Sequence, residues 1–367
     1  MAVRKLSTER QLAPLRRRID EINQKLLELL NARARVALEI GEIKRVQGAE
    51  VYQPQREQAI IEDLLARNPG PLQGEHIRYI FGEIIGACRA LEHEMRVAFL
   101  GPEYTYSHQA ALRHFGHSAR YLAEPSIPAV FAAAATGRAD WAIVPVENST
   151  EGSVPLTLDG LLDTTLTIVG EVMLPVRHAL LSLSGRRDQI RKILAHQQSL
   201  GQCRDYLAAN FPTCTQEAVA SNALAARMAA ENPASAAIAS AQAAQPYGLR
   251  VVEDAIQDMA QNITRFLVLG HQAAPRTGAD KSTIIFALPE QVGILKDALA
   301  IFARNGINLS MIQSRPQRGQ PWMYLFYADL KGHRDEPAMK RALAALRRKA
   351  LLLKLLGSYP EGRTPES

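Results

Sequence analysis

The sequence predicts a multidomain protein in which an all-helical segment is followed by an α/β segment and a compact βαββαβ unit. Three observations predict this order. Apolar residues recur at spacings of three and four through residues 12–44, which is typical of a helix that buries one stripe. At Val97 the pattern changes to short apolar runs, which indicate buried strands. From residue 281 onwards, strand and helix patterns alternate in the order of the ferredoxin-like split unit.

Length and charge restrict the classes of function. A chain of 367 residues is long enough for two or three domains. The net charge of +6 favours anionic partners. No basic run is interleaved with aromatic residues, so we expect small anionic metabolites rather than nucleic acid as partners. No apolar run reaches membrane-spanning length, so no membrane partner is expected.

The three cysteines form no CxxC pair, and their number is odd. This usage favours a reducing compartment. The first ten residues lack the apolar core of a secretory signal. We therefore expect a cytoplasmic protein.

Residues 1–95 are helical in pattern throughout. The first helix is expected over residues 12–44, the second from Pro54, and the third from about residue 75 to residue 95. Arg33 occupies a position where the first helix requires an apolar residue, and Glu92 lies on the apolar stripe of the third. Burying an unpaired charge is costly, so we expect an anion to meet Arg33.

Arg16 and Lys44 both border the seam of the first helix. They are 28 residues apart, which corresponds to about 42 Å along a straight helix. No small anion can contact both side chains of one chain. If both serve one site, a second protomer must run antiparallel and bring its own Arg16.

The middle segment, residues 97–270, alternates strand-like and helix-like patterns, which predicts an α/β fold of two lobes with a cleft. A Pro-, Gly- and Ala-rich linker follows at residues 270–281. The predicted domains are therefore residues 1–95, 96–272 and 281–360. Arg265, inside the strand-like run RFLVLG, is interpreted as a structural ion-pair partner, and His196 as a packed or hydrogen-bonded histidine.

Polar residues of the helical segment resemble the site pattern of the all-helical chorismate mutase family; they are Arg16, Arg33, Lys44, Arg56, Glu57, Cys88 and Glu92. That family forms an intertwined dimer in which each site takes one arginine from the partner chain. The resemblance implies that Arg33 and the Arg16 of the second protomer hold the carboxylates of chorismate. It implies that Lys44 and Glu92 hydrogen-bond the ether oxygen. Glu57 and the backbone near Gln53 and Arg56 would hold the hydroxyl end.

Two of these positions depart from residues seen in other members of that family. Several members have glutamine where this chain has Glu92, and some have serine at position 88. Only a protonated glutamate can donate to the ether oxygen, so we expect the rearrangement to slow as the pH rises.

The middle segment resembles prephenate dehydratase through the motifs VAFLGPEYTYSH, PVENSTEGSV, AHQQSLGQC and NITRFLVL. The resemblance implies a two-lobed, periplasmic-binding-protein-like fold with its site in the cleft. Thr264 would lie nearest the leaving hydroxyl of prephenate, acting as an oriented donor. Substrate contacts are expected from Asn148, Ser149, Thr150, Gln202 and Ser221. Tyr104 replaces a glycine of the family in a loop that can need an unusual backbone angle, and Gln197 replaces a proline.

The last unit resembles the ACT regulatory domain of phenylalanine-sensitive dehydratases. The resemblance implies that phenylalanine binds at an interface between paired domains. The expected contacts are Gly293, Ile294 and Leu295 at a helix start, and the QSRP motif formed by Gln313, Ser314, Arg315 and Pro316. Gln313 replaces the glutamate of the family, so the strength of feedback can differ.

Together the resemblances imply a bifunctional enzyme of phenylalanine biosynthesis that converts chorismate to prephenate and then to phenylpyruvate, with phenylalanine as effector. It would act without a cofactor or metal, as a homodimer whose further association stays open. Two alternatives remain: a dehydratase with an inactive helical dimerisation domain, and a non-catalytic phenylalanine sensor. Preference between prephenate and arogenate, and direct transfer of prephenate between sites, also stay open.

Overall fold

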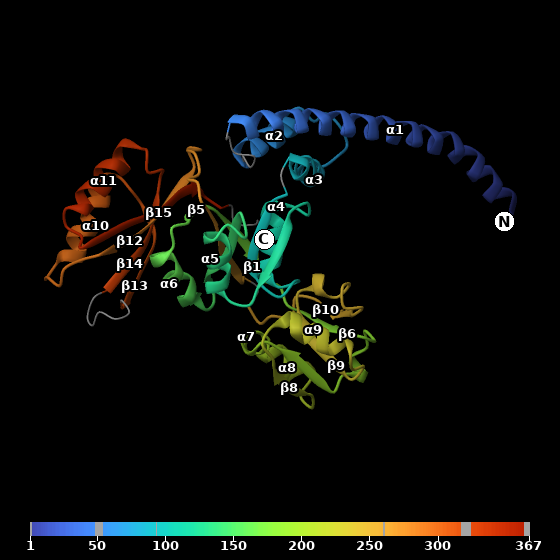
Figure 1. Ribbon diagram of the computed structural model, residues 1–367. Coiled ribbons are helices and arrows are strands. Elements are labelled where there is room, and N and C mark those ends of the chain that lie inside the picture. The colour runs from blue at the N-terminus through green and yellow to red at the C-terminus, as the bar shows by residue number, and fades with distance from the viewer. Residues whose placement is uncertain (1, 48–53, 93, 260, 317–323, 363–367) are drawn as a thin grey trace. The chain divides into compact units, whose positions relative to one another are not determined.

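The computed structural model describes residues 2–47, 54–92, 94–259, 261–316 and 324–362. The chain divides into two compact units. The helical unit comprises Met1–Met95 with Phe115–Arg120, and the second unit comprises Arg96–His114 with Tyr121–Ser367. Figure 1 shows helices at the N-terminal end and mixed strands and helices in the rest of the chain, as the sequence predicts.

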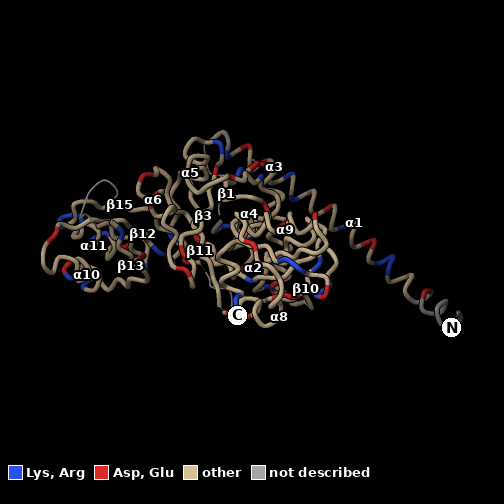
Figure 2. The backbone as a smooth tube through the Cα atoms, turned by 90° about the horizontal axis from the view of Figure 1, so that it is seen from below, with Lys and Arg blue, Asp and Glu red and all other residues tan. Residues whose placement is uncertain are grey.

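Three helices form the helical unit: α1 (Ala2–Gln47), α2 (Pro54–Ala66) and α3 (Gly74–Glu92). Helix α1 begins ten residues before the expected start at Leu12 and continues through Pro14. Lys, Arg, Asp and Glu residues alternate along much of α1 (Figure 2). Both α1 and α2 pack on α3, so α3 is the central helix of this unit.

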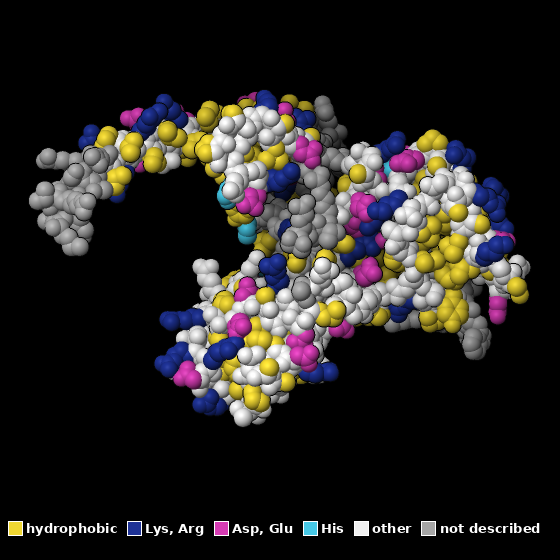
Figure 3. Space-filling model, turned by 180° about the vertical axis from the view of Figure 1, so that it is seen from behind, with side chains coloured by type: hydrophobic (Ala, Val, Ile, Leu, Met, Phe, Trp, Pro, Cys, Tyr) yellow, Lys and Arg dark blue, Asp and Glu magenta, His cyan; other side chains and the backbone are white. Residues whose placement is uncertain are grey.

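The apolar seam of α1 is exposed in a single chain. Leu29 has 67% of its surface exposed, and apolar side chains follow the helix in the space-filling view (Figure 3). The exposed seam residues are Leu12, Leu15, Ile19, Ile22, Leu26, Leu29, Val36, Ile40 and Ile43. A contiguous apolar surface of this length is typical of an interface.

Gly41 lets α1 approach α3 closely. A Cβ atom at this position would lie 2.9 Å from Cγ and 3.0 Å from Cβ of Glu92. A glycine in a helix interior costs about 1 kcal/mol relative to alanine. Here its absent side chain gives Glu92 room beside α1.

The first lobe of the second unit contains a six-stranded sheet in the order β2-β1-β3-β11-β5, with β4 paired to β3. Strand β1 runs parallel to β3, whereas β11 runs antiparallel to β3 and β5. The strands are β1 (Arg96–Leu100), β2 (Arg120–Glu124), β3 (Trp141–Asn148), β4 (Gly152–Ser153), β5 (Thr167–Pro175) and β11 (Ile263–Gly270). The helices are α4 (Tyr106–Phe115), α5 (Ile127–Ala135) and α6 (Pro155–Asp163).

The second lobe contains a five-stranded sheet in the order β10-β6-β9-β7-β8. Its strands are β6 (Ala179–Ser182), β7 (Lys192–Ala195), β8 (Thr215–Ala218), β9 (Ser235–Ala239) and β10 (Arg250–Glu253). Its helices are α7 (Gln197–Gln202), α8 (Arg204–Asn210), α9 (Asn222–Ala230), η1 (Arg187–Gln189) and η2 (Ala241–Ala243). The apolar run AAIAS at residues 236–240 predicts a buried strand, and β9 lies at this place in the structure.

The chain leaves the first lobe after β5, forms the second lobe, and returns as β11. Strand β11 then lies between β3 and β5, with Thr264 opposite Asn148 and Leu174. The end of β3 and the start of β11 therefore lie side by side. The two connections between the lobes, after β5 and before β11, lie at the same edge of the sheet.

The C-terminal unit has the predicted βαββαβ order and a four-stranded sheet in the order β13-β14-β12-β15. Its strands are β12 (Asp280–Ala287), β13 (Leu309–Pro316), β14 (Tyr324–Lys331) and β15 (Leu352–Pro360). Its helices are α10 (Ile294–Arg304) and α11 (Pro337–Arg347). Apolar residues of this sheet, among them Tyr327, Leu356 and Tyr359, belong to the same core cluster as residues of the first lobe.

A buried ion cluster joins the first lobe to the C-terminal unit. The guanidinium of Arg265 on β11 contacts Glu171 on β5 at 2.6 Å and Asp329 on β14 at 2.5 Å. Lys281 on β12 lies 2.8 Å from the other oxygen of Glu171. Burial opposes the charged form of Glu171, but Arg265 and Lys281 outweigh it and lower the pKa of this carboxyl group. The interpretation of Arg265 as a structural ion-pair partner is confirmed.

Lys354 of β15 adds a second polar link between these parts. Its ammonium donates to the carbonyl oxygens of Leu161, Leu162 and Thr164, at 3.1, 2.7 and 2.6 Å. These carbonyls end α6, where backbone acceptors lack helical partners. A cation of the C-terminal unit thus stabilises the end of a helix in the first lobe.

Candidate functional sites

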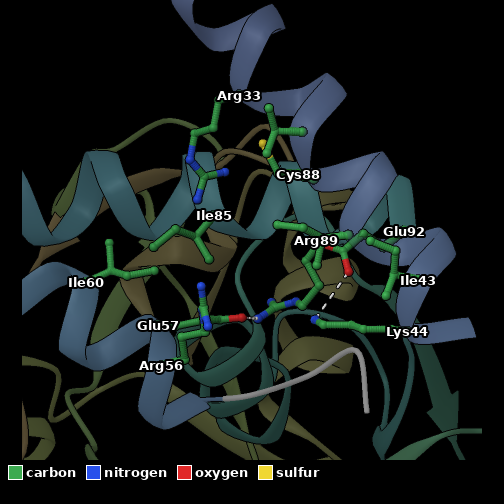
Figure 4. A pocket seen from close by; sticks show the side chains of 13 residues that line it. Arg33, Ile43, Lys44, Arg56, Glu57, Ile60, Ile85, Cys88, Arg89 and Glu92 are labelled. Atoms are coloured by element: carbon green, nitrogen blue, oxygen red, sulfur yellow. Dashed lines mark hydrogen bonds and ion pairs between the residues drawn. The ribbon is translucent and has the colours of Figure 1, made fainter. Parts of the chain in front are cut away.

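A cavity of about 510 Å³ lies between the three helices of the helical unit (Figure 4). Each helix contributes polar side chains. The residues around this helical cavity are Arg33, Val36, Ala37, Ile40, Ile43 and Lys44 from α1, Arg56, Glu57 and Ile60 from α2, and Ile85, Cys88, Arg89 and Glu92 from α3. Six of the residues that the sequence predicted for one site therefore lie around one cavity.

Two ion pairs cross the helical cavity. Lys44 Nζ lies 3.5 Å from Glu92 Oε2, and Arg89 lies 2.5 Å from Glu57 Oε1 (Figure 4). Arg89 also donates to the carbonyl oxygen of Phe115 at 2.8 Å. Arg33 forms no ion pair with any residue that the structure describes. Four cationic side chains and two carboxylates line the cavity, which leaves an excess of two positive charges.

Two predicted residues are not part of this cavity. Arg16 is exposed on α1 and does not line it, and Gln53 lies outside the described residues. Arg89 is a lining residue that the sequence analysis missed. Its signal was present: Arg89 lies four residues after Ile85 on α3, one helical turn along the same face.

A second cavity, of about 790 Å³, lies between the two lobes. Its first-lobe wall comes from the ends of β3 and β11, and its second-lobe wall from α7 and the start of α8. The residues around this inter-lobe cavity are Asn148, Thr150, Glu151, Gly152, Ser153, Val154, Pro155, His196, Gln197, Gln198, Gly201, Gln202, Arg204, Gln257, Asp258, Met259 and Asn262.

Asn148 organises the first-lobe wall of the inter-lobe cavity. Its Oδ1 accepts from the backbone N–H groups of Thr150 and Glu151, at 3.0 and 3.1 Å, and from the Thr150 hydroxyl at 2.6 Å. These donors fix the side-chain amide, because only its oxygen can accept. Its Nδ2 therefore donates to Thr264 Oγ1 at 2.8 Å and to Asn262 Oδ1 at 2.7 Å.

Thr264 is 8% exposed and lies behind Asn148. Because its oxygen accepts from Asn148, its hydroxyl hydrogen is not used in that bond. Thr264 is not among the described residues that line the inter-lobe cavity, and its hydroxyl hydrogen is available to an acceptor other than Asn148.

Gln202 links the two lobes. Its Oε1 accepts from Asn262 Nδ2 at 3.1 Å, and its Nε2 lies 3.4 Å from both Thr150 Oγ1 and Glu151 Oε1. Asn262, which directly precedes the ITRF residues, was not among the predicted contacts. Its signal was its place beside Thr264 at the start of a buried strand.

Two predicted contacts have structural tasks. Ser149 Oγ accepts from the Ile263 N–H at 3.0 Å and so holds the start of β11. Ser221 caps helix α9 by accepting from Leu224 N at 3.1 Å. Neither residue lines the inter-lobe cavity.

Tyr104 and Gln197 are the two positions at which this sequence departs from the dehydratase motifs. Tyr104 has φ of 65°, so the expected unusual backbone angle is present; its N–H donates to His108 Nδ1 at 3.0 Å. His196 caps α7 through Nδ1, which confirms it as a hydrogen-bonded histidine. Gln197 is the first residue of α7, where proline is also well tolerated.

The predicted effector residues divide into two groups. Gly293 has φ of 79° and precedes Ile294 and Leu295 at the start of α10. On edge strand β13, Ser314 and Pro316 are exposed, whereas Gln313 and Arg315 are half-buried. Gln313 donates to Ser153 Oγ, and Arg315 donates to the Pro155 carbonyl oxygen at 2.6 Å.

The described residues contain no group of three or more His, Cys, Asp or Glu side chains placed to hold a metal ion. None of the helices in the described part of the chain is both long and apolar enough to cross a bilayer.

These features define a class of protein: an enzyme with a cation-lined cavity among helices, an amide-lined cavity between two α/β lobes, and a C-terminal unit of the regulatory βαββαβ type. Three family matches follow the chain in this order. Residues 15–93 match chorismate mutase type II, residues 97–274 match prephenate dehydratase, and residues 282–348 match the ACT domain.

Full-length relatives carry the same three parts. The bifunctional chorismate mutase/prephenate dehydratase of Stutzerimonas stutzeri is 42% identical over 362 residues, covering 97% of this chain and 99% of the relative. The protein of that name from Aquifex aeolicus is 41% identical, with the same coverage. The chain belongs to the family of bifunctional chorismate mutase/prephenate dehydratases.

Solved structures support the fold of the second unit. Prephenate dehydratase from Arthrobacter aurescens, in complex with L-Phe, is 33% identical with a TM-score of 0.67, covering 72% of this chain and 90% of that chain. GqqA, described as a novel type of quorum quenching acylase, is 30% identical with the same TM-score, covering 72% and 98%. One fold therefore carries different named activities, so the fold alone does not define the activity.

Proposed function

We propose that the helical cavity rearranges chorismate to prephenate, and that the inter-lobe cavity converts prephenate to phenylpyruvate. The observation that supports the first assignment most directly is charge. Chorismate carries two carboxylates, and the lining of the helical cavity has two positive charges in excess with both glutamates ionised and three when Glu92 is protonated. A pericyclic rearrangement needs no nucleophile, so holding the reactive conformer and stabilising charge on the ether oxygen suffice.

The residue roles follow from position. Arg33 at one end of the cavity holds a carboxylate, and Lys44 and Glu92 meet the ether oxygen. Glu57 receives the substrate hydroxyl, together with the backbone near Gln53 and Arg56. Arg89 keeps the Glu57 carboxylate in place through its short ion pair. Cys88, which is buried, forms part of the wall.

The second carboxylate is held by Arg16 of the partner subunit in a homodimer. Arg16 is exposed and is separated from Arg33 by 17 residues of one helix, about 26 Å. The exposed α1 seam favours the same arrangement, because full burial of one such apolar side chain gains about 1.5–3 kcal/mol. Further association of dimers is not part of the proposal.

Dehydration of prephenate requires that a carboxylate leave as carbon dioxide while hydroxide departs and the ring becomes aromatic. The departing oxygen needs a hydrogen-bond donor. Thr264 is that donor, because Asn148 occupies its acceptor side. Asn148, Thr150 and Gln202 contact the substrate from the cavity walls, whereas Ser149 and Ser221 support the backbone.

Carboxylate binding in the inter-lobe cavity depends on neutral donors. Arg204 is the one Arg or Lys side chain among the described lining residues, which also include Glu151 and Asp258. The Asp258 carboxylate accepts from the N–H groups of Asp205 and Tyr206 at the start of α8, at 3.1 Å each. The remaining side-chain amides therefore carry most of the recognition of the substrate.

Phenylalanine is proposed as the effector of the C-terminal unit. The Arthrobacter relative is described in complex with L-Phe, and the predicted contacts are Gly293, Ile294, Leu295, Gln313, Ser314, Arg315 and Pro316. Gln313 and Arg315 contact Ser153 and Pro155, which line the inter-lobe cavity. A ligand that shifts β13 would therefore move a wall of the second site.

The functional domains are proposed as residues 1–95, 96–272 and 281–360, acting without a cofactor or metal. We also propose a cytoplasmic location, which fits three free cysteines. The alternatives of an inactive helical domain and of a non-catalytic sensor gain no support from the cation-lined helical cavity or the oriented Thr264.

Replacing Lys44 by alanine should lose about 3 kcal/mol of transition-state stabilisation, the scale of one oxyanion donor. The mutase rate of the variant measures this loss, and an unchanged rate would remove Lys44 from the site.

Co-expressing Arg16→Ala and Lys44→Ala chains should restore roughly a quarter of the wild-type mutase rate, because half of the dimers are hybrids with one complete site. Mutase rates of the single and mixed preparations check this. Absence of any recovery would remove Arg16 from the partner's site.

The mutase rate should fall as pH rises, because only protonated Glu92 can donate to the ether oxygen. A Glu92→Gln variant donates at every pH, so its rate should stay level across the same range. Rates of prephenate formation at saturating chorismate measure both profiles. Identical profiles for the two proteins would exclude Glu92 as the donor.

The wild-type protein should form phenylpyruvate from chorismate, and the Thr264→Ala variant should stop at prephenate because it lacks the donor to the leaving hydroxyl. Thr264→Ser, which keeps the hydroxyl, should retain dehydration. Absorbance of phenylpyruvate and prephenate measures both. Prephenate accumulating with the wild-type protein would refute the second activity.

Phenylalanine should inhibit dehydration, and Asp159→Asn should weaken this inhibition several-fold. Asp159 lies 3.2 Å from Arg315 and helps to attach β13 to α6, a link that transmits the shift of β13. Dose–response curves with prephenate as substrate provide the measurement.

The control is Asp63→Asn, which removes the same charge from an exposed pair with Arg67. An inhibition constant that is equal in all three proteins would contradict this route.

A further inference from the structure

His178 lies outside the inter-lobe cavity but contacts the residues that form it. It follows β5, has 1% of its surface exposed, and has partners on both ring nitrogens. Nδ1 lies 2.9 Å from the Tyr106 hydroxyl, and Nε2 lies 2.8 Å from Gln202 Oε1. Neither His178 nor Tyr106 has a role in the proposed mechanism so far.

The orientation of the Gln202 amide decides which nitrogen of His178 carries hydrogen. A carboxylate only accepts, so the amide nitrogen of Gln202 must face Glu151, where the separation is 3.4 Å. The amide oxygen then faces Asn262 Nδ2 and His178 Nε2. Two acceptors cannot bond to each other, so His178 Nε2 must carry a hydrogen.

Tyr106 completes this assignment. Its oxygen lies 2.7 Å from the Arg177 carbonyl oxygen and 2.9 Å from His178 Nδ1, and it has one hydrogen to donate. In a neutral imidazole with hydrogen on Nε2, Nδ1 is an acceptor, so Nδ1 and the Arg177 carbonyl oxygen share the one hydrogen of the Tyr106 hydroxyl. Burial lowers the pKa of His178, which favours this neutral form.

A continuous hydrogen-bond network then connects Tyr106 with Thr264, and donors from two sides meet at the Gln202 oxygen. His178 donates to Gln202, and Asn262 donates to the same Gln202 oxygen, at 2.8 and 3.1 Å. Asn262 accepts from Asn148, which also donates to Thr264. Two donors therefore hold the Gln202 oxygen, and both amides between Gln202 and Thr264 have fixed orientations.

We propose that His178 is a positioning residue of the dehydratase site, whose Nε2–H fixes Gln202 and, through Asn262 and Asn148, keeps the Thr264 hydroxyl hydrogen directed at the leaving oxygen of the substrate. This inference rests on the proposed function of the inter-lobe cavity. Without His178, Gln202 can turn its amide, and the donors that orient Thr264 lose their fixed arrangement.

The test compares His178→Leu, which removes the donor, with His178→Gln, whose amide nitrogen can donate in place of Nε2. With prephenate as substrate, kcat of the leucine variant should fall about tenfold, on the scale of one buried hydrogen bond. The glutamine variant should stay within about threefold of wild type. Equal losses in the two variants would overturn the inference.

Coupling to Gln202 separates positioning from a general structural effect. In a Gln202→Leu background, His178→Leu should cost little further activity, because His178 acts through that amide. Losses that simply multiply would show that His178 does not act through Gln202. The mutase rate of the same chains, unchanged in each variant, reports that the helical unit is intact, and an unchanged thermal unfolding transition reports that the two lobes are folded.

Tyr106→Phe provides a second variant if His178→Leu does not fold. It leaves the imidazole in place but removes the donor to Nδ1, so kcat should fall several-fold; an unchanged kcat would contradict the inference. A wild-type protein without dehydratase activity would refute the proposed function itself. If the wild-type protein is active and the His178 variants keep the wild-type kcat, only the positioning role is refuted.

Discussion

The buried contact between Arg265 and the carboxylates of Glu171 and Asp329 determines where Thr264, the proposed donor of the second site, lies. Thr264 and Arg265 are neighbours on β11, and successive side chains of a strand face opposite sides of its sheet. Thr264 faces the amides of the cleft, and Arg265 faces the C-terminal unit. Breaking a buried ion pair typically costs about 3–5 kcal/mol, because the remaining charge stays buried. A slip of β11 by one residue would exchange the two faces, so the ion cluster also fixes the register of Thr264.

The sequence predicted those features that depend on local periodicity. The long seam of α1 and the apolar runs of β3 and β11 were recognisable because each repeats over many residues. Strands such as β7, β8 and β10 have four residues each, too few for a pattern. The same limit applies to the sites. Arg33 and Glu92 stood out on apolar stripes, whereas the importance of Arg89 and His178 depends on partners far along the chain, Glu57 and Gln202. Spacing within one element does not show which polar group a distant element will bring to it.

The two cavities proposed as active sites differ in the groups that line them. The helical cavity has an excess of cations, which suits a reaction in which charge must be stabilised while no proton is transferred. The inter-lobe cavity has one arginine and mainly amide and hydroxyl groups, and two of its acids already accept hydrogen bonds. Here the direction of each hydrogen bond matters more than net charge, because a leaving hydroxyl requires a donor at one place. In the helical unit, the absent side chain of Gly41 leaves space for Glu92 next to α1, where Glu92 pairs with Lys44.

The apolar core shared by the first lobe and the βαββαβ sheet limits how this protein can be divided or recombined. Tyr327, Leu356 and Tyr359 pack in one cluster with Ala98, Leu158 and Leu267, and Lys354 ends a helix of the other part. A chain truncated before residue 280 would expose one half of that cluster to water and lose Lys281, one of the two cations that neutralise Glu171. Exchange of regulatory domains between relatives must therefore carry the matching lobe surface with it. In this architecture the unit that senses the end product shares one hydrophobic core with the first lobe, so neither part can be exchanged without the other.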